Sequence, residues 1–324
     1  MIEVKDLSKR YTVYKRRGLF REKQRIQALD HLSFSVERGA FLGYIGPNGA
    51  GKSTTVKVLT GVIVPEEGSV SVDGFCPWKN RKQYVEHIGV VFGQKSQLWW
   101  DLPVIDTYRA LGALYDVPKP VWLKRVAELS ERLSLSDFLY QPARQLSLGQ
   151  RMRAEVGASL IHDPDILFLD EPSIGMDVVS RHQMAAFLKE LNGRGKTIFL
   201  TTHDLHEIAS LCRQILLLHR GRLVFFGPLE ALKDMIHLPT IVRARVSAVQ
   251  DSRDNFSIKT SRWQCAQCGE TGEITVEVPA GESTVAASKW LMENYPVEDL
   301  KIEEPDIEEI VKLLYHGLIG NSKG

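Results

Sequence analysis

One short stretch limits what this chain can fold into more than any other. Phe41–Ile45 (FLGYI) has the composition of a buried strand, and the residues after it fit the pattern G-x-x-x-x-G-K-[ST] at every position. A helical segment follows, from about Ser53 to Thr60, and Gly61 is a plausible stop. Because strand, loop and helix occur in this order, the stretch predicts a phosphate-binding loop. Its residues are Gly46, Pro47, Asn48, Gly49, Ala50, Gly51, Lys52, Ser53 and Thr54.

The residue types in this loop predict nucleotide chemistry. Glycines let backbone N–H groups turn inward around phosphate oxygens, and the helix N-terminus adds its positive dipole end. Lys52 is expected to reach the β- and γ-phosphates, while the Ser53 hydroxyl is expected to ligate Mg²⁺. The bland alternative, a glycine-rich turn before a helix, rarely supplies Lys-Ser at this spacing.

A second half of the site is predicted more than a hundred residues downstream. Asp165–Asp170 (DILFLD) holds four consecutive apolar residues and ends in an acid, which predicts a buried parallel strand. Ligands of α/β sheets bind at the carboxyl ends of such strands. Asp170 is therefore expected to hold Mg²⁺ or its water, and Glu171 to polarise the water that attacks the γ-phosphate. A surface capping acid is the alternative, and the upstream loop favours the metal.

The basic composition of one segment leaves two interpretations open. Lys9 to Arg25 holds eight Lys and Arg residues against the single Glu22, although the whole chain has a net charge of only +1. The segment is either a solvated surface insertion or a surface for anionic lipid or a partner. The near-neutral total gives no argument for nucleic-acid binding, so no nucleic-acid partner is expected.

The sequence also bears on compartment and on cysteine chemistry. No apolar run approaches the roughly 18 residues of a membrane-spanning helix, and the N-terminal MIEVKDLSKR holds no apolar signal region, so we expect a cytosolic chain. Cys265-Ala-Gln-Cys268 is a solitary C-x-x-C without the second ligand pair of a structural zinc site. A polar loop between strands is the favoured interpretation, and a metal or redox site is the alternative.

Further motifs carry a family resemblance. Leu146-Ser-Leu-Gly-Gln150 is similar to the LSGGQ signature of ABC ATPases, and Ser173-Ile-Gly-Met-Asp177 resembles their D-loop. Gln94 resembles the Q-loop glutamine, and His203 in TTHD resembles the switch histidine. The set spans roughly residues 1–230. Within the family, GQKSQLWWDLP, QLSLGQRMR and DEPSIGMD resemble the ATPase subunits of ABC-2-type exporters, notably the viologen and multidrug exporters.

The resemblance implies an ATPase that works as a dimer. Glu171 and His203 are then catalytic, and Mg²⁺ is held by Ser53, Gln94 and Asp170. The signature residues Ser147, Gly149 and Gln150 complete the site of a second subunit, expected to be a second copy, and Asp177 is the D-loop residue. Tyr11 sits where family members stack an aromatic ring on adenine, with Tyr14 as a rival. Leu148 replaces a signature glycine, and a positive φ there is strained.

The resemblance also implies membrane partners. The ATPase would drive separate integral membrane permease subunits from the cytoplasmic face of the plasma membrane. In this family the segment after the Q-loop lies against a cytoplasmic helix of the membrane subunit, so Trp99 and Trp100 are expected to dock there. The alternative is that both indoles pack inside the helical subdomain. We expect at least one of them to be substantially exposed, because adjacent residues of an extended segment point to opposite sides.

Two other functions remain as alternatives. A soluble ABC ATPase that acts on ribosomes or DNA usually has two cassettes or long coiled coils, and this chain has neither pattern. A nucleotide-binding module without turnover conflicts with the presence of both Glu171 and His203.

The predicted fold class is α/β, a P-loop ABC ATPase core with an antiparallel β subdomain and a helical subdomain, plus a small C-terminal α+β domain. The ATP-binding domain is expected over 1–237, with the helical subdomain at about 104–160, and the accessory domain over 238–324. Strands are expected at Ile2–Leu7, Leu32–Val36 and Ser69–Val72 in the antiparallel part. The accessory domain serves packing or dimerisation, or else ligand sensing.

Overall fold

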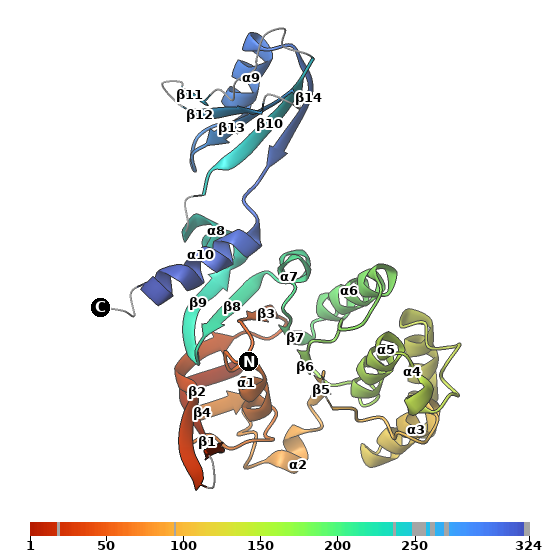
Figure 1. Cartoon of the computed structure of the whole chain (residues 1–324). Coiled ribbons are helices and arrows are strands. Elements are labelled where there is room, and N and C mark those ends of the chain that lie inside the picture. Colours follow the sequence, from red (N-terminus) through yellow and green to blue (C-terminus); the bar gives the residue numbers. More distant parts are fainter. Residues whose placement is uncertain are drawn as a thin grey trace. The chain divides into compact units, whose positions relative to one another are not determined.

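The computed structural model describes residues 1–17, 20–93, 95–235, 238–247, 257–259, 263–268 and 272–320. The chain divides into two compact units, Met1–Leu229 and Glu230–Gly324 (Figure 1). The sequence had suggested a division after residue 237. Among the described residues, no helix is both long enough and apolar enough to cross a bilayer.

A six-stranded sheet forms the centre of the first unit, in the order β5-β6-β7-β3-β8-β9. All neighbouring pairs are parallel except β8 and β9. The carboxyl ends of β6, β7 and β3 therefore meet at one edge, and the loops that follow them are brought together. The strands are β3 (Phe41–Ile45), β5 (Ile88–Phe92), β6 (Ile166–Asp170), β7 (Thr197–Thr201), β8 (Gln214–His219) and β9 (Arg222–Pro228).

A second, antiparallel sheet contains β1 (Ile2–Arg17), β2 (Phe20–Val36) and β4 (Glu67–Val72) in the order β2-β1-β4. The sequence predicted short strands that end at Leu7 and resume at Leu32. The structure instead continues the pairing past Tyr11, which lies opposite Ile26, to the end of a long hairpin. Charged residues dominate this extension and Tyr14 is 61% exposed, so no buried apolar face marks it in the sequence.

Helices surround the central sheet and build the helical subdomain, as predicted. α1 follows the phosphate-binding loop, and α3, α4 and α5 form the helical subdomain (Figure 1). A Cβ added at Gly112 of α3 would lie 3.2 Å from the indole of Trp122 on α4, so the missing side chain lets these helices approach closely. The bounds are α1 (Lys52–Leu59), α2 (Arg81–Tyr84), α3 (Val104–Leu114), α4 (Lys119–Arg132), η1 (Ala143–Gln145), α5 (Leu148–Ser159), α6 (Val178–Gly193) and α7 (Leu205–Leu211).

An aromatic cluster joins the two sheets of the first unit. Phe199 of β7 is fully buried, and its ring centroid lies 5.2 Å from that of Tyr44 on β3 and 5.7 Å from that of Phe168 on β6. Phe34 of β2 approaches the same ring at 6.4 Å, from the antiparallel sheet. The cluster therefore fixes three of the strands whose ends carry the candidate site.

The second unit is an α+β domain built on an antiparallel five-stranded sheet in the order β11-β12-β13-β10-β14. Its core contains Val242, Val276 and Leu291. α8 begins at the boundary between the units. The bounds are α8 (Leu229–Met235), β10 (Thr240–Val246), β11 (Ser257–Lys259), β12 (Gln264–Cys268), β13 (Glu273–Val278), α9 (Thr284–Asn294), β14 (Val297–Glu303) and α10 (Ile307–Gly320).

The Cys265–Cys268 stretch is not the loop that the sequence suggested. It lies on β12, where Cys265 pairs with Val276 and Cys268 with Glu273 of β13. Cys, Ala and Gln are weak indicators of a strand, but the ladder offered by the alternating β13 overrides the local preference.

Truncation of the aromatic cluster is expected to destabilise the first unit. Phe199→Ala removes a fully buried ring that touches both sheets, so the free energy of unfolding should fall by about 3–5 kcal/mol. Chemical denaturation of the variant measures this loss. Leu114→Ala is the matched control, because that side chain is 73% exposed, and it should change stability by less than about 0.5 kcal/mol. Equal effects of the two variants would contradict the assigned core.

Candidate functional site

A cleft of about 490 Å³ opens where the phosphate-binding loop meets the end of β6. It brings together residues that are far apart in the sequence, from β1, β2, the loop after β3 and the loop after β6. The residues that line it are Tyr11, Ile26, Gln27, Ala28, Pro47, Asn48, Gly49, Ala50, Gly51, Lys52, Ser53, Thr54, Gly93, Asp170 and Glu171. Gly46 precedes this set, and a Cβ there would lie 2.6 Å from the backbone oxygen of Leu218, so only glycine fits.

Lys52 is the cation of this cleft. Its side chain is 7% exposed, and its Nζ donates to the backbone oxygen of Gly46 at 2.5 Å and of Pro47 at 3.4 Å. Burial lowers the pKa of Lys52, whereas the charges of Glu171 and Asp170 raise it. The ammonium group is thus held between loop carbonyls and two carboxylates, a position from which it can pass to a phosphate oxygen.

Asp170 and Glu171 face this cation from the end of β6. Thr201, the last residue of β7, donates its hydroxyl proton to one carboxylate oxygen of Asp170 and fixes that side chain. Glu171 has a φ of 53°, in the left-handed region, and its N–H donates to the backbone oxygen of Thr201 at 2.9 Å. A non-glycine residue in this conformation costs on the order of 1 kcal/mol, and such strain is concentrated at functional sites.

His203 completes the group. It lies two residues after β7, and its Nδ1 is 3.5 Å from Oε1 of Glu171. His203 is largely exposed and Glu171 is half-buried, so both side chains can be reached from the cleft. Lys52, Asp170, Glu171 and His203 therefore come together as the sequence suggested: Lys52 begins α1, Asp170 ends β6, and the other two follow β6 and β7.

The residues present fit a Mg²⁺ ion. Mg²⁺ prefers hard oxygen ligands, and the Ser53 hydroxyl and the Asp170 carboxylate both line the cleft. Gln94, the third expected ligand, lies outside the described residues.

The signature residues lie away from this cleft within the single chain. Ser147 caps α5: its Oγ accepts from the N–H of Gln150 at 3.2 Å, and its own N–H donates to Oε1 of Gln150 at 2.9 Å. Leu148 begins the helix without a positive φ, so the strain that the sequence raised does not arise. Its side chain lies against Gly175, where a Cβ would be 2.4 Å from it, and Gly149 follows within the helix.

Two more predicted residues, Asp177 and Tyr11, lie in different parts of the first unit. Asp177 caps α6 by accepting from the N–H of Ser180 at 2.9 Å, outside the cleft. Tyr11 lines the cleft, whereas its rival Tyr14 does not.

Trp99 is 53% exposed and Trp100 is 51% exposed. The prediction that at least one of them is substantially exposed is therefore confirmed. Their backbone is nevertheless anchored. The N–H of Trp99 donates to Oγ1 of Thr107 at 3.1 Å, and the oxygen of Trp100 accepts from the N–H of Arg144 at 3.0 Å.

Some residues in or beside the cleft were missed by sequence reasoning. Thr201 holds Asp170, and its place before the TTHD histidine could have indicated it. Ile26, Gln27 and Ala28 line the cleft from β2, and no sequence signal marked them because the long hairpin was not predicted.

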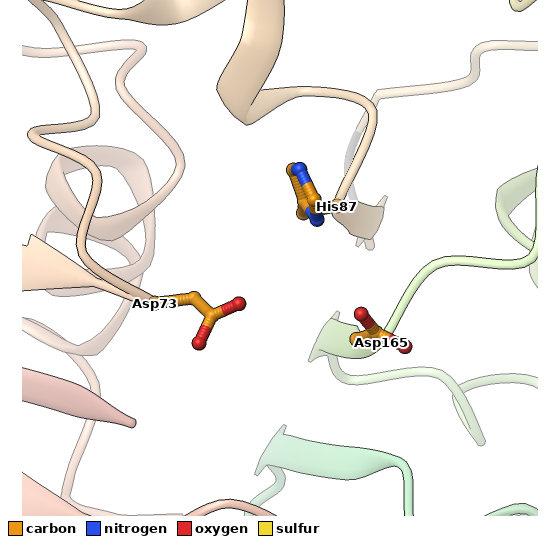
Figure 2. Close-up of side chains that lie close together, drawn as sticks. All are labelled: Asp73, His87 and Asp165. Carbon is orange, nitrogen blue, oxygen red and sulfur yellow. The ribbon is translucent and has the colours of Figure 1, made fainter.

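A second group of possible metal ligands lies elsewhere. Figure 2 shows Asp73, His87 and Asp165 around a common space, with one ligand atom of each within 4.8 Å of the others. Asp73 is already engaged, because Nε of Arg38 donates to it at 2.9 Å and the N-terminal amine lies 3.6 Å away. The hydrogen bond from Arg38 lowers the pKa of Asp73, and Asp165 acts on the same guanidinium. Two cations thus already balance the two carboxylates, which argues against a metal there.

Comparison with known proteins agrees with this site. Residues 29–174 match the family model described as ABC transporter. The chain is 30% identical to the ABC transporter ATP-binding protein NatA of Bacillus subtilis, over 72% of this chain and 91% of that protein. It is 33% identical to the Nod factor export ATP-binding protein I of Cupriavidus metallidurans, over 78% of this chain and 82% of that protein.

Among solved structures, one similar fold is the dimeric post-hydrolysis state of the ATP-binding cassette MJ0796 bound to ADP and Pi. The TM-score is 0.62 at 26% identity, over 71% of this chain and 99% of that one. These matches agree with a cleft that is lined by a phosphate-binding loop and by the carboxylates of Asp170 and Glu171. The chain belongs to the ABC transporter ATP-binding proteins and is an ABC-type ATPase.

Proposed function

We propose that this chain is the ATP-hydrolysing subunit of an exporter, acting as a dimer on separate membrane subunits. The observation that carries the proposal is the convergence of Lys52, Asp170, Glu171 and His203 at one edge of the central sheet. Export is supported by the Nod factor export protein among the relatives, which the chain covers over most of its length.

The geometry suggests how ATP is hydrolysed. The triphosphate enters the loop after β3, and Lys52 exchanges the carbonyls of Gly46 and Pro47 for β- and γ-phosphate oxygens. Tyr11, which lines the same cleft, stacks on the adenine. Ser53, Gln94 and Asp170 would hold Mg²⁺, which would supply positive charge beside the phosphates.

Glu171 then accepts a proton from a water molecule, whose oxygen attacks the γ-phosphorus as the bond to ADP breaks. His203 orients the water and the γ-phosphate, and its contact with Glu171 keeps both groups at the same place. The products are ADP and inorganic phosphate.

A second copy would complete each site. Ser147 uses its Oγ as an acceptor for the helix cap, so its hydroxyl proton remains free to donate to a γ-phosphate of the partner's site. Gly149 and Gln150 follow at the same helix start, where N–H groups favour an anion. Exposed apolar side chains lie beside these groups, as expected of a surface covered in a dimer. They are Leu148, Ile174, Val178 and Val179.

The membrane partner would dock on Trp99 and Trp100. Both indoles are half exposed on a backbone held by Thr107 and Arg144, so little ordering entropy is lost on binding. Tryptophan is a favoured interface anchor. This docking would hold the ATPase at the cytoplasmic face of the plasma membrane.

Glu171→Gln is expected to separate binding from hydrolysis. The amide cannot take the proton of the attacking water, so turnover should fall by about 10²–10⁴-fold while ATP binding is kept. ATP turnover and size-exclusion chromatography with ATP are the measurements, and the ATP-bound dimer should accumulate. His203→Ala should lower turnover by about 10²-fold. Glu128→Gln, on the exposed surface of α4, is the control. A Glu171→Gln variant that turns over ATP at the parent rate rules out this base.

Trp99→Ala/Trp100→Ala is expected to remove membrane docking without unfolding the chain. Each anchor contributes up to a few kcal/mol to an interface, so copurification with the membrane subunits and transport should be lost. The melting temperature should change by less than about 2 °C, because both indoles are half exposed. Val121→Ala/Leu123→Ala is the matched control, since those side chains are 43% and 45% exposed on α4. A double tryptophan variant that unfolds, or still copurifies, contradicts docking by this patch.

A further inference from the structure

A buried carboxylate links two segments of the ATPase. Glu155 of α5 is 2% exposed, and among the described residues it forms no salt bridge. It accepts hydrogen bonds from the hydroxyl of Ser96 and from the N–H of Gln97, at 3.1 and 3.2 Å to its two oxygens. The N–H of Leu98 approaches one of these oxygens at 3.5 Å. One side chain thus holds three consecutive residues.

A second hydrogen bond runs between the same partners. The side-chain amide of Gln97 donates to the backbone oxygen of Glu155 at 3.1 Å. Segment 96–98 and α5 are thus joined by hydrogen bonds in both directions. One turn earlier on α5, the guanidinium of Arg151 lies 5.8 Å from the ring centroid of Trp100. Helix α5 therefore contacts both residues 96–98 and Trp100.

Stability alone does not account for a charge at this position. Burial raises the pKa of Glu155, which shows that its environment disfavours the charged form despite the hydrogen bonds. A buried carboxylate costs several kcal/mol in desolvation, and an apolar residue of similar volume is often as stable. The hydrogen bonds of Glu155 do fix the backbone of 96–98, which an apolar side chain could not do.

The two ends of this link reach different nucleotide sites. Segment 96–98 begins two residues after Gln94, and Gly93 lines the cleft of the same chain. Ser147, eight residues before Glu155, caps the same helix, about 12 Å along its axis. A helix of this length moves as one body. Displacement of 96–98 would therefore shift Ser147.

We propose that Glu155 is a positioning residue that couples the two ATP sites of the dimer. It transmits the nucleotide state sensed after Gln94 in one site to Ser147, which serves the other site. The inference rests on the proposed function, because it needs Ser147 to act on the partner's nucleotide.

The test compares Glu155→Gln with Tyr108→Phe in the full chain. Glu155→Gln keeps the shape but replaces one acceptor oxygen by an NH₂ group. Tyr108→Phe removes a fully buried hydroxyl that donates to the backbone oxygen of Ala154 at 2.8 Å, one residue away, without a bond to 96–98. The control therefore disturbs the same turn of α5 and leaves the link intact.

Hydrogen exchange with and without ATP is the first measurement. In the parent and in Tyr108→Phe, ATP should slow exchange both in peptides over 93–98 and in peptides over 146–151. In Glu155→Gln the first response should remain and the second should be lost. A second response that persists in Glu155→Gln, or that Tyr108→Phe loses equally, overturns the proposal. A parent that binds ATP without hydrolysing it refutes the proposed function but leaves this comparison valid.

The dependence of turnover on ATP concentration is the second measurement. The Hill coefficient should exceed 1 in the parent and in Tyr108→Phe and fall to about 1 in Glu155→Gln, since coupled sites become independent. Ser96→Ala removes the hydroxyl that donates to Glu155 and leaves the sequence of α5 unchanged. This variant replaces Glu155→Gln in the test if Glu155→Gln does not fold. It should lower the Hill coefficient in the same direction. A Hill coefficient equal to the parent value in both Glu155→Gln and Ser96→Ala contradicts the coupling.

Discussion

The parallel pairing of β6, β7 and β3 is the constraint on which the site depends. It places the loop of Lys52, the carboxylates of Asp170 and Glu171, and His203 at one edge of one sheet. The aromatic cluster around Phe199 packs these three strands against one another. The cation then lies between loop carbonyls and carboxylates, so the charges of the site are arranged before any ligand arrives.

Features with a local sequence signal were predicted from the sequence, and those set by distant contacts were not. The strand, loop and helix around Lys52 follow from residues that are neighbours in the chain. The long hairpin, in which Tyr11 pairs with Ile26, was missed because charged residues dominate its sequence. No alternation of apolar and polar residues marks it as a pair of strands. The strand at Cys265 depends on its partner β13. The contact of Leu148 with Gly175 joins two motifs that only the folded chain brings together.

The hydrogen bonds of Ser147 connect the single chain to the proposed dimer. Its cap on α5 holds the hydroxyl at a helix start that does not line the cleft of the same chain. In the proposed dimer a complete site would need two chains, and nucleotide binding would join them. The same helix carries Glu155 and Arg151, which hold the segment that ends in the exposed tryptophans. In the proposed function, hydrolysis, dimer closure and membrane docking would therefore share one helix, α5.

Turnover by mixed dimers tests the shared site most directly. Two differently tagged copies would carry Lys52→Ala and Ser147→Ala, either on separate copies or together on one copy beside an unchanged one. If sites form between chains, the separated pair retains one intact site and therefore measurable turnover. The pair on one copy then leaves none. The reverse result, activity only when both substitutions share a copy, would show that each chain completes its own site and would contradict the account.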